Sequence, residues 1–303
     1  MKRWSDHPAY PHVLMLVQTL TVAPGYIFGK PATMAFPIEV LMPIRIVGAS
    51  LFYWLLLFLT NRNAIQAFRP TRGQWKQFFG FALVGTVLNQ LTFMMGLRFT
   101  TPAHSALLFA LVPMLVVVIS VLILKSERMN IGKAAGILLA LMGVSWVIYS
   151  SQPGTVTASD VWLGDGITIL SVLCWAVYMS NSRQLVQQFE PLTFITVLMT
   201  VGALIVLPIG IYPALTYDYS QISTEAWWGY VYLTIGSSAV SYLLLVFALK
   251  KMHASRVAIY INAQPVFTTL ISLSIGTDEP SWSFLTGGLL VVTGIYVLNR
   301  ARF

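Results

Sequence analysis

Ten separate runs of apolar residues follow one another along the 303-residue chain. A helix that crosses the hydrocarbon core of a bilayer needs about 20 predominantly apolar residues. With 57% hydrophobic and only 9% charged residues, a soluble fold of this length could not bury its apolar surface, since soluble domains carry about 25% charged residues. The runs are bounded by charges, Pro and Gly, and they predict an all-α integral membrane protein with ten transmembrane helices at 12–29, 38–60, 75–97, 102–124, 131–150, 163–187, 191–214, 226–249, 254–275 and 283–299.

The positive charges predict the orientation of these helices. If the N-terminus is cytoplasmic, all of the 18 Lys and Arg residues except Lys30, Arg45 and Arg98 fall in cytoplasmic segments. Because cytoplasmic loops carry the excess of basic residues, we expect a multi-pass protein of the inner (plasma) membrane with both termini in the cytoplasm. The net charge of +8 is dispersed over short loops, whereas nucleic-acid binders gather basic residues on one face. The expected partners are therefore the lipid bilayer and a small-molecule substrate, not nucleic acid.

The two halves of the chain resemble each other. A shift of 152 to 154 residues superimposes them and places Trp75 on Trp227 and Pro113 on Pro265. Each half holds an odd number of expected helices, so the second half must enter the membrane from the opposite side. Such inverted repeats recur in secondary transporters, where the substrate site lies near the midplane between the repeats. The sequence predicts two inverted-topology five-helix repeats within one membrane domain, at 12–150 and 163–299.

Several motifs resemble those of the drug/metabolite transporter superfamily, in its EamA-type exporter branch. They are Arg45-Ile46, the duplicated Pro113-Met114 and Pro265-Val266, Leu173-Cys174-Trp175-Ala176 followed by Ser182-Arg183, and the glutamates Glu127 and Glu279. The resemblance implies a ten-helix exporter of amino acids or other small metabolites. It also implies a cavity lined mainly by the helices at 12–29, 75–97, 102–124, 163–187, 226–249 and 254–275.

Two prolines lie near the middle of expected helices. Pro113 and Pro265 each remove one backbone hydrogen bond and free the carbonyl four residues earlier. A freed carbonyl in a bilayer needs a partner or a water-lined cavity, and paired interrupted helices point to a transport site. We expect helix kinks or gating elements at both prolines; kinks that only shape packing are the alternative.

Polar and aromatic side chains at similar depth are the candidate substrate-binding residues. Intramembrane polar groups tend to face the bundle interior, although the amides could equally serve as hydrogen bonds between helices. The aromatic rings could stack on an apolar solute or bind an ammonium group, or simply pack. These candidates are Asn89, Gln90, Trp175, Tyr178, Tyr242, Tyr260, Asn262 and Gln264.

Charged residues within the expected helices are few. Arg45 lies about 10 Å from the outer end of its helix at 1.5 Å per residue, so we expect its side chain to reach the interface. Glu39 is nearer still to that surface, and His104 opens the helix at 102–124 and could carry a proton. No Asp or Glu is expected at the middle of a helix, which favours a facilitator, or coupling through His104 or Glu39.

These patterns predict the transport of a neutral or zwitterionic, amino-acid-like metabolite by alternating access. The alternative is a proton-coupled drug or amine exporter. No HExxH, GxSxG or glycine-rich phosphate motif is present, so we expect neither an enzyme nor a cofactor. Cys174 is the only cysteine and the four histidines are scattered, so no metal site is expected. A non-transporting receptor or scaffold is a further alternative, and the oligomeric state stays open.

Overall fold

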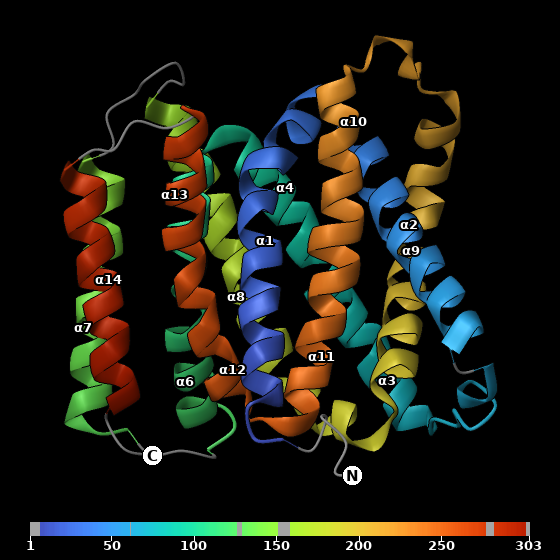
Figure 1. Cartoon of the computed structure of the whole chain (residues 1–303), viewed down its shortest axis with the longest axis horizontal. Helices are drawn as coiled ribbons and strands as arrows, with labels where there is room; N and C mark the ends of the chain where they lie inside the picture. The colour runs from blue at the N-terminus through green and yellow to red at the C-terminus, as the bar shows by residue number, and fades with distance from the viewer. Residues whose placement is uncertain (1–6, 61, 126–128, 151–157, 277–281, 301–303) are drawn as a thin grey trace.

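The protein is described here from a computed structural model that covers residues 7–60, 62–125, 129–150, 158–276 and 282–300. All regular structure in these ranges is helical, and the helices lie roughly parallel in one bundle (Figure 1). The repeat landmarks Glu127 and Glu279 lie outside the described residues.

Six helices run without a change of type. They are α1 (Tyr10–Ala35), α2 (Ile38–Thr60), α7 (Ile131–Ser150), α8 (Ala158–Gln188), α9 (Pro191–Thr216) and α14 (Trp282–Arg300). Prolines within α1, α2 and α9 do not interrupt them. Two short 3₁₀ turns, η2 (Arg62–Ala64) and η4 (Tyr219–Gln221), lie in connections between helices.

Four further helical segments change type partway. Two contain π-helix: α3 (Arg72–Phe81), η3 (Ala82–Leu88) and α4 (Asn89–Phe99) in one, and α10 (Thr224–Val231), η5 (Tyr232–Val240) and α11 (Ser241–Lys251) in the other. The other two are broken: α5 (Pro102–Phe109) is followed by α6 (Val112–Leu122), and α12 (Ala254–Ala258) is joined to α13 (Gln264–Ile275) by the 3₁₀ segment η6 (Ile259–Ala263). Pro113 and Pro265 lie in the first turns of α6 and α13.

Eight of the described segments are long and apolar enough to cross a membrane. The apolar stretches of α7 and α14 are shorter, at Ile131–Gly143 and Leu285–Gly294. Each expected range coincides with an observed helical segment. The start of α1 and the end of α14 lie at the same end of the bundle (Figure 1), as an even number of crossings requires. The protein is thus a multi-pass membrane protein, while ten crossings and cytoplasmic termini stay predictions.

The irregular segments occur in pairs that match the predicted repeat. The π-helical segments η3 and η5 lie in the third expected helix of each half, and the breaks before Pro113 and Pro265 lie in the fourth. A π-helical segment is rare and is frequently found at a functional site. These matched irregularities support the inverted repeat, which itself stays a prediction.

The helices α7 and α14 pack against each other at one edge of the bundle (Figure 1). Glycines allow this approach: a Cβ atom at Gly294 would lie 2.5 Å from the backbone nitrogen of Ala140, and one at Gly143 would lie 2.5 Å from the carbonyl oxygen of Gly287. Helices in a bilayer associate closely through such small residues. The pair leaves the other helices to surround the centre of the bundle.

Candidate central cavity

A cavity of about 60 Å³ lies in the centre of the bundle. That is room for roughly four water molecules at about 15 Å³ each. Its polar lining comes from α1, α2, α4, η5, α11 and α13, and consists of Gln18, Arg45, Asn89, Gln90, Ser237, Ser241 and Gln264. The lining contains no carboxylate.

Aromatic rings form the rest of the wall. The rings of Trp175 and Tyr242 meet edge to face at 5.0 Å between centroids. Tyr26, Phe93 and Phe109 form a second group, in which Tyr26 and Phe93 are 5.5 Å apart and Phe93 and Phe109 are 5.8 Å apart. The apolar part of a bound solute would contact the faces and edges of these rings.

Two predicted amides of the lining hold helices together. The Asn89 side-chain nitrogen donates to the Ser171 carbonyl and hydroxyl oxygens, both at 3.0 Å, and so joins α4 to α8. The Tyr26 hydroxyl donates to Gln264 Oε1 at 2.9 Å and joins α1 to α13. Each amide thus serves the interhelical role expected as the alternative, while still bordering the cavity.

Tyr242 connects the cavity to the π-helical segment η3. Its hydroxyl donates to the Gly85 carbonyl oxygen at 2.9 Å. Tyr178 packs against the same glycine from α8, and its ring lies 5.4 Å from that of Trp175. Tyr178 is fully buried behind Trp175 and does not line the cavity, so the structure gives it a packing position.

Arg45 lies in the cavity and not at the membrane interface. Only 3% of the residue is exposed, and its Nε donates to the Ser238 hydroxyl oxygen at 2.9 Å. The expectation that this side chain reaches the interface is wrong, because it turns sideways into the bundle where η5 provides that hydroxyl. Arg45 lies about 10 Å inside its helix, and a charged side chain within a transmembrane segment is rare and costly. Such a cost is typical of functional positions.

Gln90 shares the hydroxyl that Arg45 uses. The Ser238 Oγ lies 3.4 Å from Gln90 Oε1, to which it donates. Four buried atoms of the lining have no hydrogen-bond partner in the part of the chain that the structure describes: Arg45 Nη1, Gln90 Nε2, Gln18 Oε1 and Ser237 Oγ. Buried polar groups are normally hydrogen-bonded, so the cavity offers two donors, one acceptor and one hydroxyl for a solute.

Other predicted site residues lie away from this lining. The Tyr260 hydroxyl pairs with His12 Nδ1, and Asn262 lies in η6 without lining the cavity. Pro113 and Pro265 also lie outside the lining. The helix breaks that precede them are close to it, since Phe109 and Gln264 line the cavity. Glu39 is exposed in the first turn of α2.

The structure also adds residues that the sequence did not single out. Gln18, Val22, Gly25, Phe93 and Phe109 line the cavity. An amide within an apolar run was the available signal for Gln18. No sequence signal marked Phe93 and Phe109 as residues of the cavity wall, since phenylalanines occur in most of the other helices as well.

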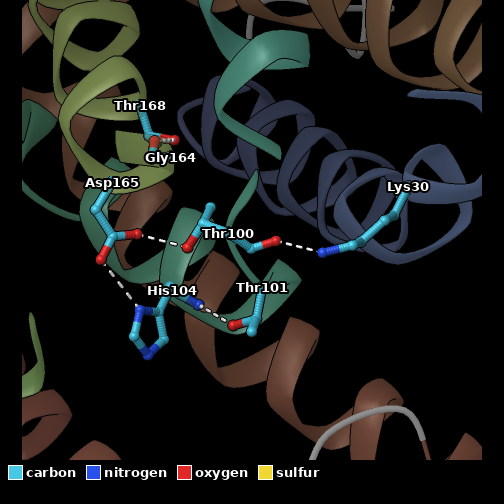
Figure 2. A network of polar contacts seen from close by, with 7 residues as sticks. All are labelled: Lys30, Thr100, Thr101, His104, Gly164, Asp165 and Thr168. Atoms are coloured by element: carbon cyan, nitrogen blue, oxygen red, sulfur yellow. Dashed lines mark hydrogen bonds and ion pairs between the residues drawn. The ribbon is translucent and has the colours of Figure 1, made fainter. Parts of the chain in front are cut away.

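A second buried polar cluster lies where α4 meets α5, and Figure 2 shows its contacts. The Thr100 hydroxyl donates to Asp165 Oδ1 at 2.5 Å, and His104 Nδ1 lies 3.2 Å from Asp165 Oδ2. Lys30 donates to the Thr100 carbonyl oxygen. We call Lys30, Thr100, His104 and Asp165 the end network, and it ties α1 and the α4–α5 turn to α8.

Asp165 is a buried acid that the sequence reading overlooked. It lies about 10 Å along α8 from the start of that helix at 1.5 Å per residue, and only 2% of it is exposed. It does not reach the middle of the helix, so the expectation of no acid at the midplane is unchanged. A buried carboxylate paired with His104 nevertheless exists. No group of three or more His, Cys, Asp or Glu suited to a metal ion occurs among the described residues.

Comparison with known proteins identifies the class that this bundle and cavity define. The EamA-like transporter family matches residues 10–149 and 162–300. The chain therefore belongs to the EamA-like transporter family, and it is a membrane transporter.

Relatives agree with this assignment. The "Uncharacterized transporter YyaM" of Bacillus subtilis (strain 168) is 29% identical over 70% of this chain and 69% of its own length. An "Uncharacterized transporter" of Archaeoglobus fulgidus is 22% identical over 96% of this chain and 98% of its own. One solved structure superimposes with a TM-score of 0.68 at 18% identity, over 96% of both chains, and at that identity it shows the fold alone.

Proposed function

We propose that the protein is a secondary transporter that exports a small neutral or zwitterionic, amino-acid-like metabolite across the inner membrane by alternating access. The observation that carries this proposal is the central cavity, lined by helices of both predicted repeats and bordered by their irregular segments. Backbone irregularity at membrane depth is tolerated where it lines a cavity or is buried in protein. The dispersed basic residues support an orientation with both termini in the cytoplasm.

The lining supports this class of solute. Amides and hydroxyls can bind amino and carboxyl groups, and the aromatic wall suits an apolar side chain. An amine or drug cation fits less well, because Arg45 places a positive charge in the same cavity. No carboxylate of the lining offsets that charge.

Counterflow in proteoliposomes tests the proposal. The labelled panel would hold neutral and aromatic amino acids, polyamines and quaternary cations. We expect saturable exchange of an amino acid, reduced about tenfold by Gln264→Ala, because that change removes a cavity amide and the partner of Tyr26. The matched control is Asn181→Ala, since Asn181 bonds only a carbonyl of its own helix among the contacts described. Exchange confined to cations would contradict the proposal.

One observation favours proton coupling as a second candidate function. The His104–Asp165 pair places a titratable base beside a buried acid, as proton relays in transporters do. Near this end of the elements that pack here, the charged or titratable groups are Lys30 of α1, Arg98 of α4, His104 of α5, and Asp160 and Asp165 of α8. His12 of α1 and Arg183 of α8 lie a further 18 residues along their helices.

A pH gradient decides between a facilitator and a coupled carrier. In a coupled carrier, a gradient drives solute accumulation in proteoliposomes, and both Asp165→Asn and His104→Gln abolish accumulation while leaving counterflow. In a facilitator, the gradient changes nothing. Accumulation that survives both substitutions would remove the end network from the coupling mechanism.

A further inference from the structure

Arg45 is a buried cation whose surroundings contain only neutral groups. The cavity lining holds no Asp or Glu, and the only ion pair found in the described part of the chain joins His104 to Asp165. The contacts of Arg45 there are the Ser238 hydroxyl and the Phe93 ring, whose centroid lies 6.0 Å from the guanidinium carbon. Neither contact neutralises the charge.

Arg45 and Gln90 meet at the hydroxyl of Ser238. Ser238 Oγ accepts from Arg45 Nε at 2.9 Å and lies 3.4 Å from Gln90 Oε1. Arg45 and Gln90 are therefore held against one hydroxyl. Each keeps a buried nitrogen, Nη1 and Nε2, that has no partner among the described residues. Both residues line the cavity, so these two N–H donors, one of them charged, are available there to the oxygens of a carboxylate.

We propose that Arg45 and Gln90 form a subsite for the carboxylate of the transported solute. The planar guanidinium matches a carboxylate in geometry and supplies the countercharge that the cavity lacks. The inference rests on the proposed transport function and narrows it to α-amino acids with a large apolar side chain. Gln18 Oε1 and Ser237 Oγ, also unpaired in the described part of the lining, accept from the ammonium group. The aromatic wall contacts the side chain.

Matched probes test the subsite on the unaltered protein. Binding to purified protein in lipid nanodiscs would be measured by calorimetry for leucine, methionine and phenylalanine, and for the amide of each. The carboxylates without an amino group, 4-methylpentanoate and 3-phenylpropionate, complete the panel. We expect at least one amino acid to bind about tenfold or more tightly than its amide, and its desamino carboxylate to bind measurably. Equal binding of acid and amide, or no binding by any of the three amino acids, overturns the proposal.

Variants then assign the effect to Arg45. We expect Arg45→Gln to raise the dissociation constant of the amino acid about 30-fold or more and to reduce its advantage over the amide to within about threefold. Arg45→Lys keeps the charge and loses the planar fork, so it should retain part of the preference. Arg45→Lys replaces Arg45→Gln as the test variant if size-exclusion chromatography shows that Arg45→Gln does not fold. The control is Arg256→Gln, at an exposed position in the last turn of α12. A preference unchanged in both Arg45 variants overturns the assignment.

Flux separates this proposal from the proposed function. Carboxylate-dependent binding without flux in proteoliposomes would leave the subsite intact and refute secondary transport. Flux of solutes with no preference for a carboxylate would uphold transport and refute the subsite.

Discussion

The two polar clusters inside this protein differ in whether their charged groups have partners of opposite charge. In the end network, Asp165 faces His104 and accepts from Thr100, while Lys30 donates to the Thr100 carbonyl oxygen. In the cavity, Arg45 meets a serine hydroxyl and an aromatic ring. The first cluster brings groups of opposite charge together. The second leaves a cation without an anion among the described residues.

This difference indicates what each cluster does. Satisfied buried networks rigidify the elements that they join, and the end network joins α1 and the α4–α5 turn to α8. Those elements belong to different predicted repeats, so the proposed alternating access would separate Asp165 from Thr100 when this end opens. An unsatisfied cluster gains most of its hydrogen bonds when a solute arrives. We therefore propose that the end network holds the helices together and closes this end, and that the cavity recognises the solute.

Reversing the cavity charge should have the largest effect. Arg45→Glu places an anion where the solute carboxylate would lie, and like charges brought together cost several kcal/mol. We expect amino-acid exchange in proteoliposomes to fall more than about 100-fold, while exchange of the corresponding amide is kept or increased. Arg256→Glu is the control at an exposed site. If Arg45→Glu exchanged amino acids near the wild-type rate, the cavity cation would not be the group that recognises the solute, and the proposed difference between the two clusters would be wrong.

Crowding the end network should have an intermediate effect, on stability. A Cβ atom at Gly164 would lie 2.7 Å from the Thr100 nitrogen and 2.8 Å from the Phe99 carbonyl carbon, both backbone atoms. Such overpacking costs about 1–3 kcal/mol. We expect Gly164→Ala to lower the free energy of unfolding, measured by SDS titration in mixed micelles, by about that amount.

The neighbouring Gly166 provides the matched control. No atom lies within 4 Å of a Cβ atom built there, and alanine is favoured over glycine inside a helix by about 0.5–1 kcal/mol. Gly166→Ala should therefore leave stability unchanged or raise it. Equal losses in both variants would show that the contact between α8 and the α4–α5 turn does not depend on close approach at Gly164.

The helix ranges could be predicted from the sequence, because a run of about 20 predominantly apolar residues is typical of a transmembrane helix. The π-helical segments could not, since Ala82–Leu88 and Tyr232–Val240 carry no distinctive residue pattern. The placement of Asn89, Gln90, Trp175 and Gln264 in mid-helix led to the cavity, where all four lie.

Arg45 and Asp165 show where the sequence reading reached its limit. Distance along a helix axis can be counted from the sequence, but the direction in which a side chain points depends on neighbouring helices. Arg45 turns inward because η5 brings Ser238 to it. Asp165 is buried because Gly164 lets the α4–α5 turn approach α8. Both outcomes depend on contacts between residues far apart in the chain.

The smallest effect should come from removing the hydroxyl that holds the cavity donors. Ser238→Ala deletes the 2.9 Å bond to Arg45 Nε and the contact with Gln90. A typical hydrogen bond contributes about 0.5–1.5 kcal/mol, so we expect a three- to tenfold weaker affinity for the amino acid by calorimetry, with its preference over the amide retained. Ser274→Ala is the control, because its exposed hydroxyl donates to the Leu270 carbonyl in its own helix. A loss of preference as large as that expected for Arg45→Gln would mean that Ser238 itself recognises the carboxylate, and that Arg45 only orients it.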